Sequence, residues 1–218
     1  QIVLTSDTAP DKIQGMEKII HQIWVGPFEM PDREKRFIAA LKEKNPSWEH
    51  MFWTNENVPE LPPKLKTVYD AFGKNKDYAH QADVLRVYVV KLYGGVYLDV
   101  DFKCINGFEN ENFENLNGLY LYHGGNDFTI PNGAFGSAKD HPLINYMLEQ
   151  IDAAKWGWYG PSWMGNTVRE YYGLKHECDH NLLIPKLQAD KIRYKFFSEF
   201  EKVNFKHYAL YSWSPENR

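Results

Sequence analysis

Two carboxylates one residue apart, Asp99 and Asp101, close the apolar stretch GGVYLDVD. Paired carboxylates repel each other unless a divalent cation or a proton relieves the repulsion. Oxygen ligands suit Mg²⁺ or Mn²⁺, and such ions usually keep positions open for waters and substrate phosphates. The pair therefore predicts a metal site for a phosphate-bearing ligand. Because a D-x-D triplet alone is a weak pattern, a strand-end turn with two solvated carboxylates is the alternative.

The helix expected just before this stretch carries His80, Asp83 and Arg86 at intervals of three, so they share one stripe. Arginine is the natural planar partner of phosphate, and a carboxylate accepts hydrogen bonds from hydroxyl groups. Because the helix leads through two glycines directly into the Asp-Val-Asp strand, Asp83 and Arg86 are expected to converge on the same metal. The alternative is a surface salt bridge between them, which would contribute little to stability.

Trp24 lies near the end of another apolar stretch, KIIHQIWVG, which reads as a first buried strand. The glycine that closes this stretch allows close approach of a backbone. A flat indole ring at this place would stack on a nucleobase. The alternative is a core tryptophan, which is the commoner role of such a residue.

Strands and helices alternate along the chain and are expected to position these residues. Strands are predicted in KIIHQIWVG, HMFWT, GGVYLDVD and GLYLYH, and helices over residues 32–45, 65–72, 78–93, 141–154 and 161–173. This alternation favours an α/β fold with a mostly parallel central sheet flanked by helices, whose ligands tend to lie beyond the carboxyl ends of the strands. If the strand of GGVYLDVD extends to its end, Asp99 and Asp101 lie on one side of it.

Composition excludes some classes of protein. The 218 residues suit a single domain, and 43% apolar residues suffice for a packed core. A net charge of −4 argues against nucleic acid as a partner, and the two cysteines, Cys104 and Cys178, show no zinc-site spacing. The apolar runs are too short for a membrane segment, and the start does not resemble a signal peptide. We therefore expect a soluble domain of cytoplasmic type, excised from a longer protein because it begins with Gln1.

Two blocks of the sequence, KIIHQIWVG and YAHQADVLRVYVVKLYGGVYLDVD, resemble the two signature blocks of the DXD-containing glycosyltransferases of family 32. This family is the group of the yeast-type initiating mannosyltransferases. The two blocks also resemble those of the related glucosylating toxin domains. The A-x-x-x-D-x-x-R helix, the Gly-Gly pair and the Y-L-D-x-D strand occur in the expected order. Two later segments agree more loosely with the family. They are PNGAFGSAKDHPLI, which holds an asparagine followed by a small-residue loop, and YGPSWMGNTV. The resemblance implies a GT-A nucleotide-diphospho-sugar transferase fold over residues 1–218. It also implies a compact member of the kind that bacteria and large DNA viruses carry, the latter acting in the host cytoplasm.

The resemblance also implies roles for single residues. Trp24 would stack on the base, Asp83 and Arg86 would hold the sugar hydroxyls and a phosphate, and Asp99 would hold the ribose or the sugar. Asp101, with Asp99 beside it, would bind a Mn²⁺ or Mg²⁺ that bridges the diphosphate. Further nucleotide-sugar-binding residues would be Ile23, Ala79, Tyr97 and Asn132, whereas His141 is expected only to begin a helix.

Near the end of the chain, members of the family often offer a histidine or serine as a further metal ligand beside a tryptophan that reaches the leaving phosphate. In FKHYALYSWSPENR this place holds Tyr211 instead. The remaining candidates for the metal ligand are Ser212, Ser214 and His207, with Trp213 alongside in the nucleotide-sugar site.

The function implied by the resemblance is a metal-dependent retaining glycosyltransferase. It would move a sugar from a UDP- or GDP-sugar to a hydroxyl of a glycan or glycoprotein acceptor. The residues alone leave a metal-dependent phosphoesterase open, although it would want further ligands for a second ion. They also leave open a non-catalytic carbohydrate-binding module, in which aspartates bind Ca²⁺ and aromatic residues bind sugar. In the glycosyltransferase, the aromatic residues Trp156, Trp158, Tyr159 and Trp163 are expected to form a wall that stacks on the acceptor sugar, for which core packing is the equally good alternative.

Overall fold

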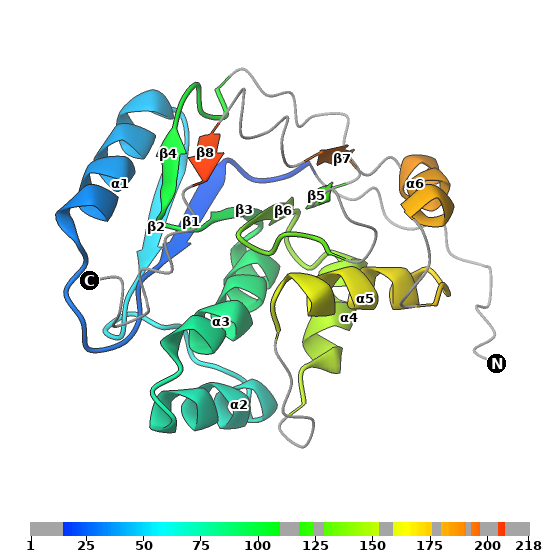
Figure 1. The fold of residues 1–218 in the computed structure, drawn as a ribbon, viewed down its shortest axis with the longest axis horizontal. Coiled ribbons are helices and arrows are strands. Elements are labelled where there is room, and N and C mark those ends of the chain that lie inside the picture. The colour runs from blue at the N-terminus through cyan, green and yellow to red at the C-terminus, as the bar shows by residue number, and fades with distance from the viewer. Residues whose placement is uncertain are drawn as a thin grey trace.

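A six-stranded sheet forms the centre of the molecule (Figure 1). The computed structural model describes residues 15–109, 118–123, 129–152, 159–175, 180–190, 193–196 and 205–207. The strands of the central sheet follow the order β2-β1-β3-β6-β5-β7. Their bounds are Glu49–Trp53 (β2), Ile19–Ile23 (β1), Gly95–Leu98 (β3), Ala134–Ser137 (β6), Leu119–His123 (β5) and Arg193–Phe196 (β7).

Most pairs of neighbouring strands in this sheet run parallel. β1 pairs in parallel with both β2 and β3, and β5 pairs in parallel with β7. Only β6 runs antiparallel to its neighbours, β3 and β5. A separate two-stranded sheet joins β4 (Phe102–Cys104) to β8 (Phe205–His207). The predicted α/β fold with a mostly parallel central sheet is confirmed.

Helices cover both faces of the sheet (Figure 1). Leu41 of α1 (Asp32–Lys44) packs with Ile20 and Val96 in one apolar cluster. The other cluster joins Ile23 and Tyr97 to the remaining helices. These are α2 (Pro63–Lys74), α3 (Tyr78–Tyr93), α4 (Pro142–Gln150), α5 (Pro161–Tyr171) and α6 (His180–Ala189). Side chains alternate between the faces of a strand, so β1 and β3 each contribute to both clusters.

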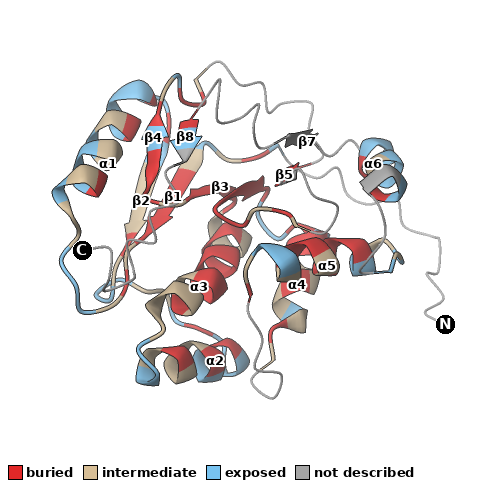
Figure 2. Ribbon diagram, in the orientation of Figure 1, coloured by how far each residue is buried: buried red, intermediate tan, exposed pale blue. Residues whose placement is uncertain are grey.

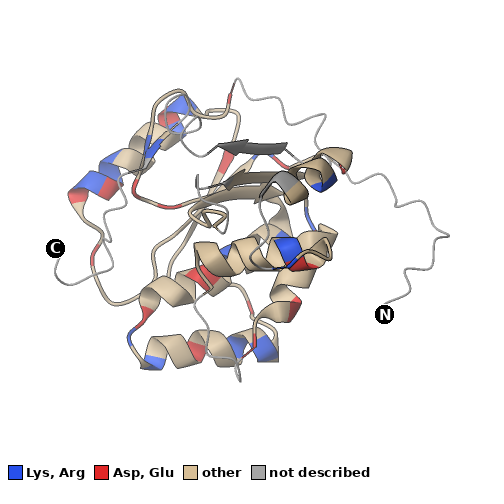
Figure 3. Cartoon of the chain, turned by 45° about the vertical axis from the view of Figure 1, so that its right-hand side comes forward, with Lys and Arg blue, Asp and Glu red and all other residues tan. Residues whose placement is uncertain are grey.

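The two helices beside the first strands differ in their exposure. α1 shows an exposed outer face (Figure 2) that carries charges of both signs (Figure 3). Its acidic residues gather in the first turn and its basic residues in the last, which suits the helix dipole. α3 is buried around nearly its whole circumference from Asp83 to Val90. The bounds of α3 agree with the sequence, but the alternative of a surface Asp83–Arg86 salt bridge is wrong, because both side chains are buried.

Two expectations about local structure are wrong. The strand of GGVYLDVD ends at Leu98, because the chain turns there: the amide of Asp99 donates to the carbonyl of Gly133 at 2.8 Å. The expected small-residue loop contains a central strand, β6. A Cβ on Gly136 would lie 2.8 Å from the sulfur of Met16, so a glycine suits this crowded place. The small side chains that suggested a loop are those that fit the crowded centre of the sheet.

Three further observations concern expectations from the sequence. His141 begins α4, as predicted, and its ring nitrogen accepts a hydrogen bond from the amide of Leu143 at 3.1 Å. Cys104 is a buried free thiol. Among the helices of the described residues, none has the length and apolarity that crossing a membrane requires.

Candidate functional site

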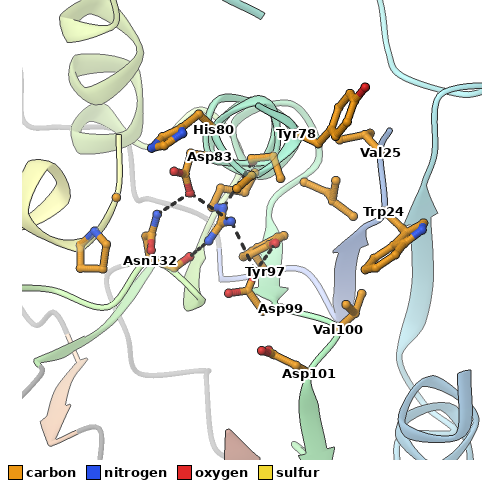
Figure 4. A pocket seen from close by; sticks show the side chains of 16 residues that line it. Trp24, Val25, Tyr78, His80, Asp83, Tyr97, Asp99, Val100, Asp101 and Asn132 are labelled. Carbon is orange, nitrogen blue, oxygen red and sulfur yellow. Dashed lines mark hydrogen bonds and ion pairs between the residues drawn. The ribbon is translucent and has the colours of Figure 1, made fainter. Parts of the chain in front are cut away.

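A cavity of about 320 Å³ opens beyond the carboxyl ends of β1 and β3, beside the first turns of α3 (Figure 4). The position agrees with the expectation for an α/β sheet. The cavity brings together most of the residues singled out in the sequence: Ile23, Trp24, Ala79, Asp83, Arg86, Tyr97, Asp99, Asp101 and Asn132. The other candidates, Ser212, Trp213 and Ser214, lie outside the described residues. His207 is described only as the last residue of β8.

Arg86 holds the polar groups of the cavity together. Its Nη2 lies 3.0 Å from Oδ1 of Asp83 and 3.4 Å from Oδ1 of Asp99, and its Nη1 donates to the carbonyl of Asn132 at 2.8 Å. The guanidinium also lies over the ring of Tyr97, 4.6 Å from the ring centroid, as in a cation–π contact. One arginine from α3 therefore ties together side chains and backbone from three parts of the chain.

Burial sets the electrostatics of this network. It raises the pKa of Asp83 to about 6, even though Arg86, His80 and a hydrogen bond from Asn132 act in the opposite direction. For Arg86, burial lowers the pKa, but Asp99, Tyr97 and the neighbouring aspartates together raise it above its ordinary value. Arg86 therefore keeps its positive charge although only 6% of the residue is exposed.

The two aspartates of the DXD triplet lie in the turn after β3, at the edge of the cavity. Oδ1 of Asp99 accepts a hydrogen bond from the hydroxyl of Tyr97 at 2.5 Å, and its carbonyl accepts one from Gln22 at 3.3 Å. Asp101 lines the same cavity and is buried. A Cβ on Gly133 would lie only 2.6 Å from Oδ2 of Asp99, so the absence of a side chain at position 133 leaves that carboxylate its place.

Asp99 and Asp101 fit a divalent cation by their chemistry. They offer only oxygen donors, which Mg²⁺ and Mn²⁺ prefer. No group of three histidine, cysteine, aspartate or glutamate side chains able to hold a metal occurs among the residues that the structure describes. A cation held by these two carboxylates would therefore share its remaining positions with waters and with a phosphate-bearing ligand.

Trp24 directly follows β1 and is half-buried, so it is not a core tryptophan. Its indole nitrogen donates to the carbonyl of Phe28 at 2.8 Å, which fixes the ring at the wall of the cavity. Asn55 holds the backbone of Gly26 from both sides: it accepts from the amide at 3.0 Å and donates to the carbonyl at 2.6 Å. Gly26 has a left-handed φ of 106°, and a Cβ on it would lie 2.8 Å from the ring of Tyr78. This loop presents Trp24 across the cavity from Asn132 (Figure 4).

Asn132 orients Asp83. Its side-chain nitrogen donates to Oδ1 of Asp83 at 2.7 Å and to the carbonyl of Tyr159 at 3.2 Å. The sequence had suggested a place near the sugar or the acceptor, and Asn132 does line the cavity. Its amide hydrogens, however, are used within the protein.

Some residues of the site were missed by the sequence analysis. Val25, Tyr78, Val100, Gly160 and Pro161 also line the cavity. The spacing of three that links His80 to Asp83 was a signal that His80 lines it too. The proposed aromatic wall is not supported at Tyr159, which is 3% exposed and packs edge-on against the half-buried Trp163. Trp156 and Trp158 lie outside the described residues.

Solved structures define the class of this fold. The structure described as "PaToxG Glycosyltransferase" aligns with a TM-score of 0.65 at 19% identity, over 81% of this chain and 75% of that chain. Another, described as "Structure of Transferase", gives a TM-score of 0.51 at 14% identity, over 88% of this chain and 93% of that chain. The fold is that of GT-A glycosyltransferases, and this prediction is confirmed.

Sequence comparison finds a family model that matches part of the chain. Residues 31–117 match the model of the glycosyltransferase sugar-binding region containing the DXD motif. These residues are similar to the DXD region of those glycosyltransferases, which confirms the resemblance seen in the sequence.

Two curated relatives extend this comparison. An uncharacterised glycosyltransferase of Acanthamoeba polyphaga mimivirus is 30% identical over 61% of this chain and 54% of its own length. The inositol phosphoceramide mannosyltransferase 3 of Schizosaccharomyces pombe is 25% identical over 92% of this chain and 60% of its own length. The chain therefore spans little more than half the length of these relatives.

Proposed function

We propose that this chain is a metal-dependent glycosyltransferase that moves a sugar from a nucleotide diphosphate sugar to a hydroxyl group. The observation that carries the proposal is the buried Arg86, paired with Asp83 and with Asp99 of the DXD triplet at the base of one cavity. A guanidinium held in a partly dry site is suited to bind a phosphate group.

The charge of the cavity supports the dependence on metal. Three aspartates and one arginine are the charged residues that line it, so the described wall is net negative. A nucleoside diphosphate is itself an anion, and it would meet repulsion from this wall. Asp99 and Asp101 would hold a divalent cation, which would supply the missing positive charge and Lewis-acid chemistry.

The protein's own residues would act by position and charge. Arg86 stabilises the negative charge that develops on the diphosphate as the sugar–phosphate bond breaks. Asp83, oriented by Asn132, accepts hydrogen bonds from sugar hydroxyls. Trp24 offers a ring face to the base. No covalent intermediate with the protein is needed, and the resemblance to family 32 supports retention at the anomeric carbon.

For the substrates, we propose a UDP- or GDP-linked hexose as donor and a hydroxyl of a glycan or glycoprotein as acceptor. The names of the relatives support a hexose, because the protein of S. pombe is named a mannosyltransferase. That relative's name also offers a glycolipid, inositol phosphoceramide, as an acceptor to include in a screen.

The proposed function is tested by incubating the protein with UDP-glucose, UDP-galactose or GDP-mannose and measuring release of the free sugar. We expect slow, Mn²⁺-dependent hydrolysis of one donor, which stops when the metal is chelated. Release of phosphate from simple esters without hydrolysis of any donor would instead indicate a phosphoesterase. Binding of a glycan without metal, again with no hydrolysis, would indicate a carbohydrate-binding module.

A further inference from the structure

The Trp24 loop, residues 24–28, follows β1 and carries the indole ring that lines the cavity. β1 and β2 pair in parallel as far as Ile23 and Trp53, where both strands end. One more backbone bond extends this pairing, because the amide of Trp24 donates to the carbonyl of Trp53 at 2.8 Å. The backbone of the loop is therefore in register with the segment that follows β2.

Asn55, two residues after β2, continues the pairing with its side chain. Its Oδ1 accepts a hydrogen bond from the amide of Gly26 at 3.0 Å, and its Nδ2 donates one to the carbonyl of the same glycine at 2.6 Å. A side-chain amide offers the same donor and acceptor as a peptide group. Its orientation is determined here, because a backbone N–H only donates and a backbone carbonyl only accepts. Asn55 thus binds both backbone groups of one residue in the Trp24 loop.

The conformation of Gly26 affects the orientation of the indole ring. Gly26 has a φ of 106°, and a glycine loses more conformational freedom on folding than any other residue. The two bonds from Asn55 therefore select one of the many conformations that this backbone could adopt. The indole nitrogen of Trp24 donates to the carbonyl of Phe28 at 2.8 Å, so the loop closes on the ring across Gly26. A change at Gly26 would alter the relative positions of Trp24 and Phe28, and with them the ring.

We propose that Asn55 is a positioning residue for the nucleobase: it holds Gly26 in the conformation in which Trp24 presents its ring face to the base. Asn55 lies outside the set of described residues that line the cavity, so it acts through Trp24 and not by contact with the ligand. This inference rests on the proposed function, because it requires a base stacked on Trp24. It extends the donor site to a residue of the neighbouring loop.

A double-mutant cycle tests whether Asn55 acts through Trp24. Its members are the wild-type protein, Asn55→Ala, Trp24→Ala and the double variant. The control Asn145→Ala, on α4, also removes a bond between an asparagine side chain and a backbone carbonyl, that of Asp140 at 2.9 Å. Calorimetric titration in Mn²⁺ measures the affinity of each protein for UDP, for GDP and for pyrophosphate, which has the diphosphate but no base.

We expect Asn55→Ala to weaken binding of the nucleotide about threefold, the scale of one net hydrogen bond, and to leave the affinity for pyrophosphate unchanged. In the Trp24→Ala background the same substitution should cause no further loss, because the ring that Asn55 positions is gone. Asn145→Ala should bind both ligands as the wild-type protein does. A loss that depends on both the base and the indole is a result that a merely structural role of Asn55 would not give.

Three results would overturn the inference while the proposed function stands. Asn55→Ala could bind the nucleotide as tightly as the wild-type protein, or it could weaken nucleotide and pyrophosphate alike. It could also cause an equal loss with and without the indole, which would mean that Asn55 does not act through Trp24. If the wild-type protein binds neither UDP nor GDP, the proposed function fails, and the inference about Asn55 fails with it.

Discussion

The buried His21 predicts a loss of stability in mild acid. It lies on β1 and is fully buried, where its Nε2 contacts the carbonyl of Gly94 at 2.7 Å and its Nδ1 accepts from the indole nitrogen of Trp53 at 3.1 Å. The imidazole is therefore neutral, with its hydrogen on Nε2. If Nδ1 were protonated, it would face the indole N–H of Trp53, so two donors would lie against each other. The charged ring would also lie in the core.

The magnitude follows from the pKa. Burial lowers the pKa of His21 from 6.5 to about 4, although the hydrogen bond to Gly94 acts in the opposite direction. The unfolded chain therefore takes up a proton at a higher pH than the folded one. The contribution of neutral His21 to the free energy of unfolding is complete above about pH 6.5 and is lost as the pH falls toward 4. The total is about 3 kcal/mol, of which about 2 kcal/mol is lost between about pH 7 and pH 5.

A matched variant isolates this effect. The raised pKa of Asp83, about 6, stabilises the fold in acid and would partly hide the loss in the wild-type protein alone. His21→Gln cannot be protonated but leaves Asp83 in place, so the difference between the two proteins reports His21. Urea denaturation followed by tryptophan fluorescence gives the free energy of unfolding of each.

The expected result is a wild-type protein that loses about 2 kcal/mol relative to His21→Gln between about pH 7 and pH 5. The variant is less stable at neutral pH, because it packs less well against Trp53, so the two curves approach each other in acid. Parallel curves would refute the reasoning, since they would mean that His21 titrates alike in the folded and unfolded protein.

Three further substitutions test the site. Arg86→Met leaves buried carboxylates without their cation, so we expect urea denaturation to show a loss of about 3–5 kcal/mol, and an unchanged midpoint would contradict the buried pairing. Gly133→Ala places a methyl group against Asp99 and should weaken Mn²⁺-dependent nucleotide binding about tenfold in calorimetry, whereas Gly15→Ala, with open space around it, should not. Trp24→Ala should weaken free-nucleotide binding about tenfold through lost stacking, and retained affinity with lower solubility would instead indicate a packing role.

The elements around the site were largely predictable from the sequence. The helical spacing of apolar residues up to Tyr93 and the two glycines after it fix the end of α3 and the start of β3. Gly94 and Gly95 both adopt positive φ, and a Cβ on either would overlap a neighbour. Local sequence therefore carried the information for the helix–strand unit that bears Arg86 and the DXD triplet.

What the sequence could not predict depends on contacts between distant segments. The burial of Arg86 results from packing of α3 between the sheet and other helices, which no local spacing reveals. Gly136 of β6 lies against Met16 and Val96, which are far away in the chain. Aspartate is a residue type favoured at helix starts, but the contact of Oδ2 of Asp77 with Nδ1 of His80 at 2.6 Å depends on how both side chains pack in the folded chain.

We propose that Asp101 and Arg86 face one metal-dependent site for a nucleoside diphosphate. The most direct test is calorimetric binding of UDP and GDP, each with Mn²⁺ and with chelator, to the wild-type protein, to Asp101→Ala and to the surface control Asp70→Ala. We expect metal-dependent binding of one nucleotide, which is lost in Asp101→Ala at unchanged stability and retained in Asp70→Ala. Equal affinity of Asp101→Ala and wild type, or binding that ignores the chelator, would contradict it.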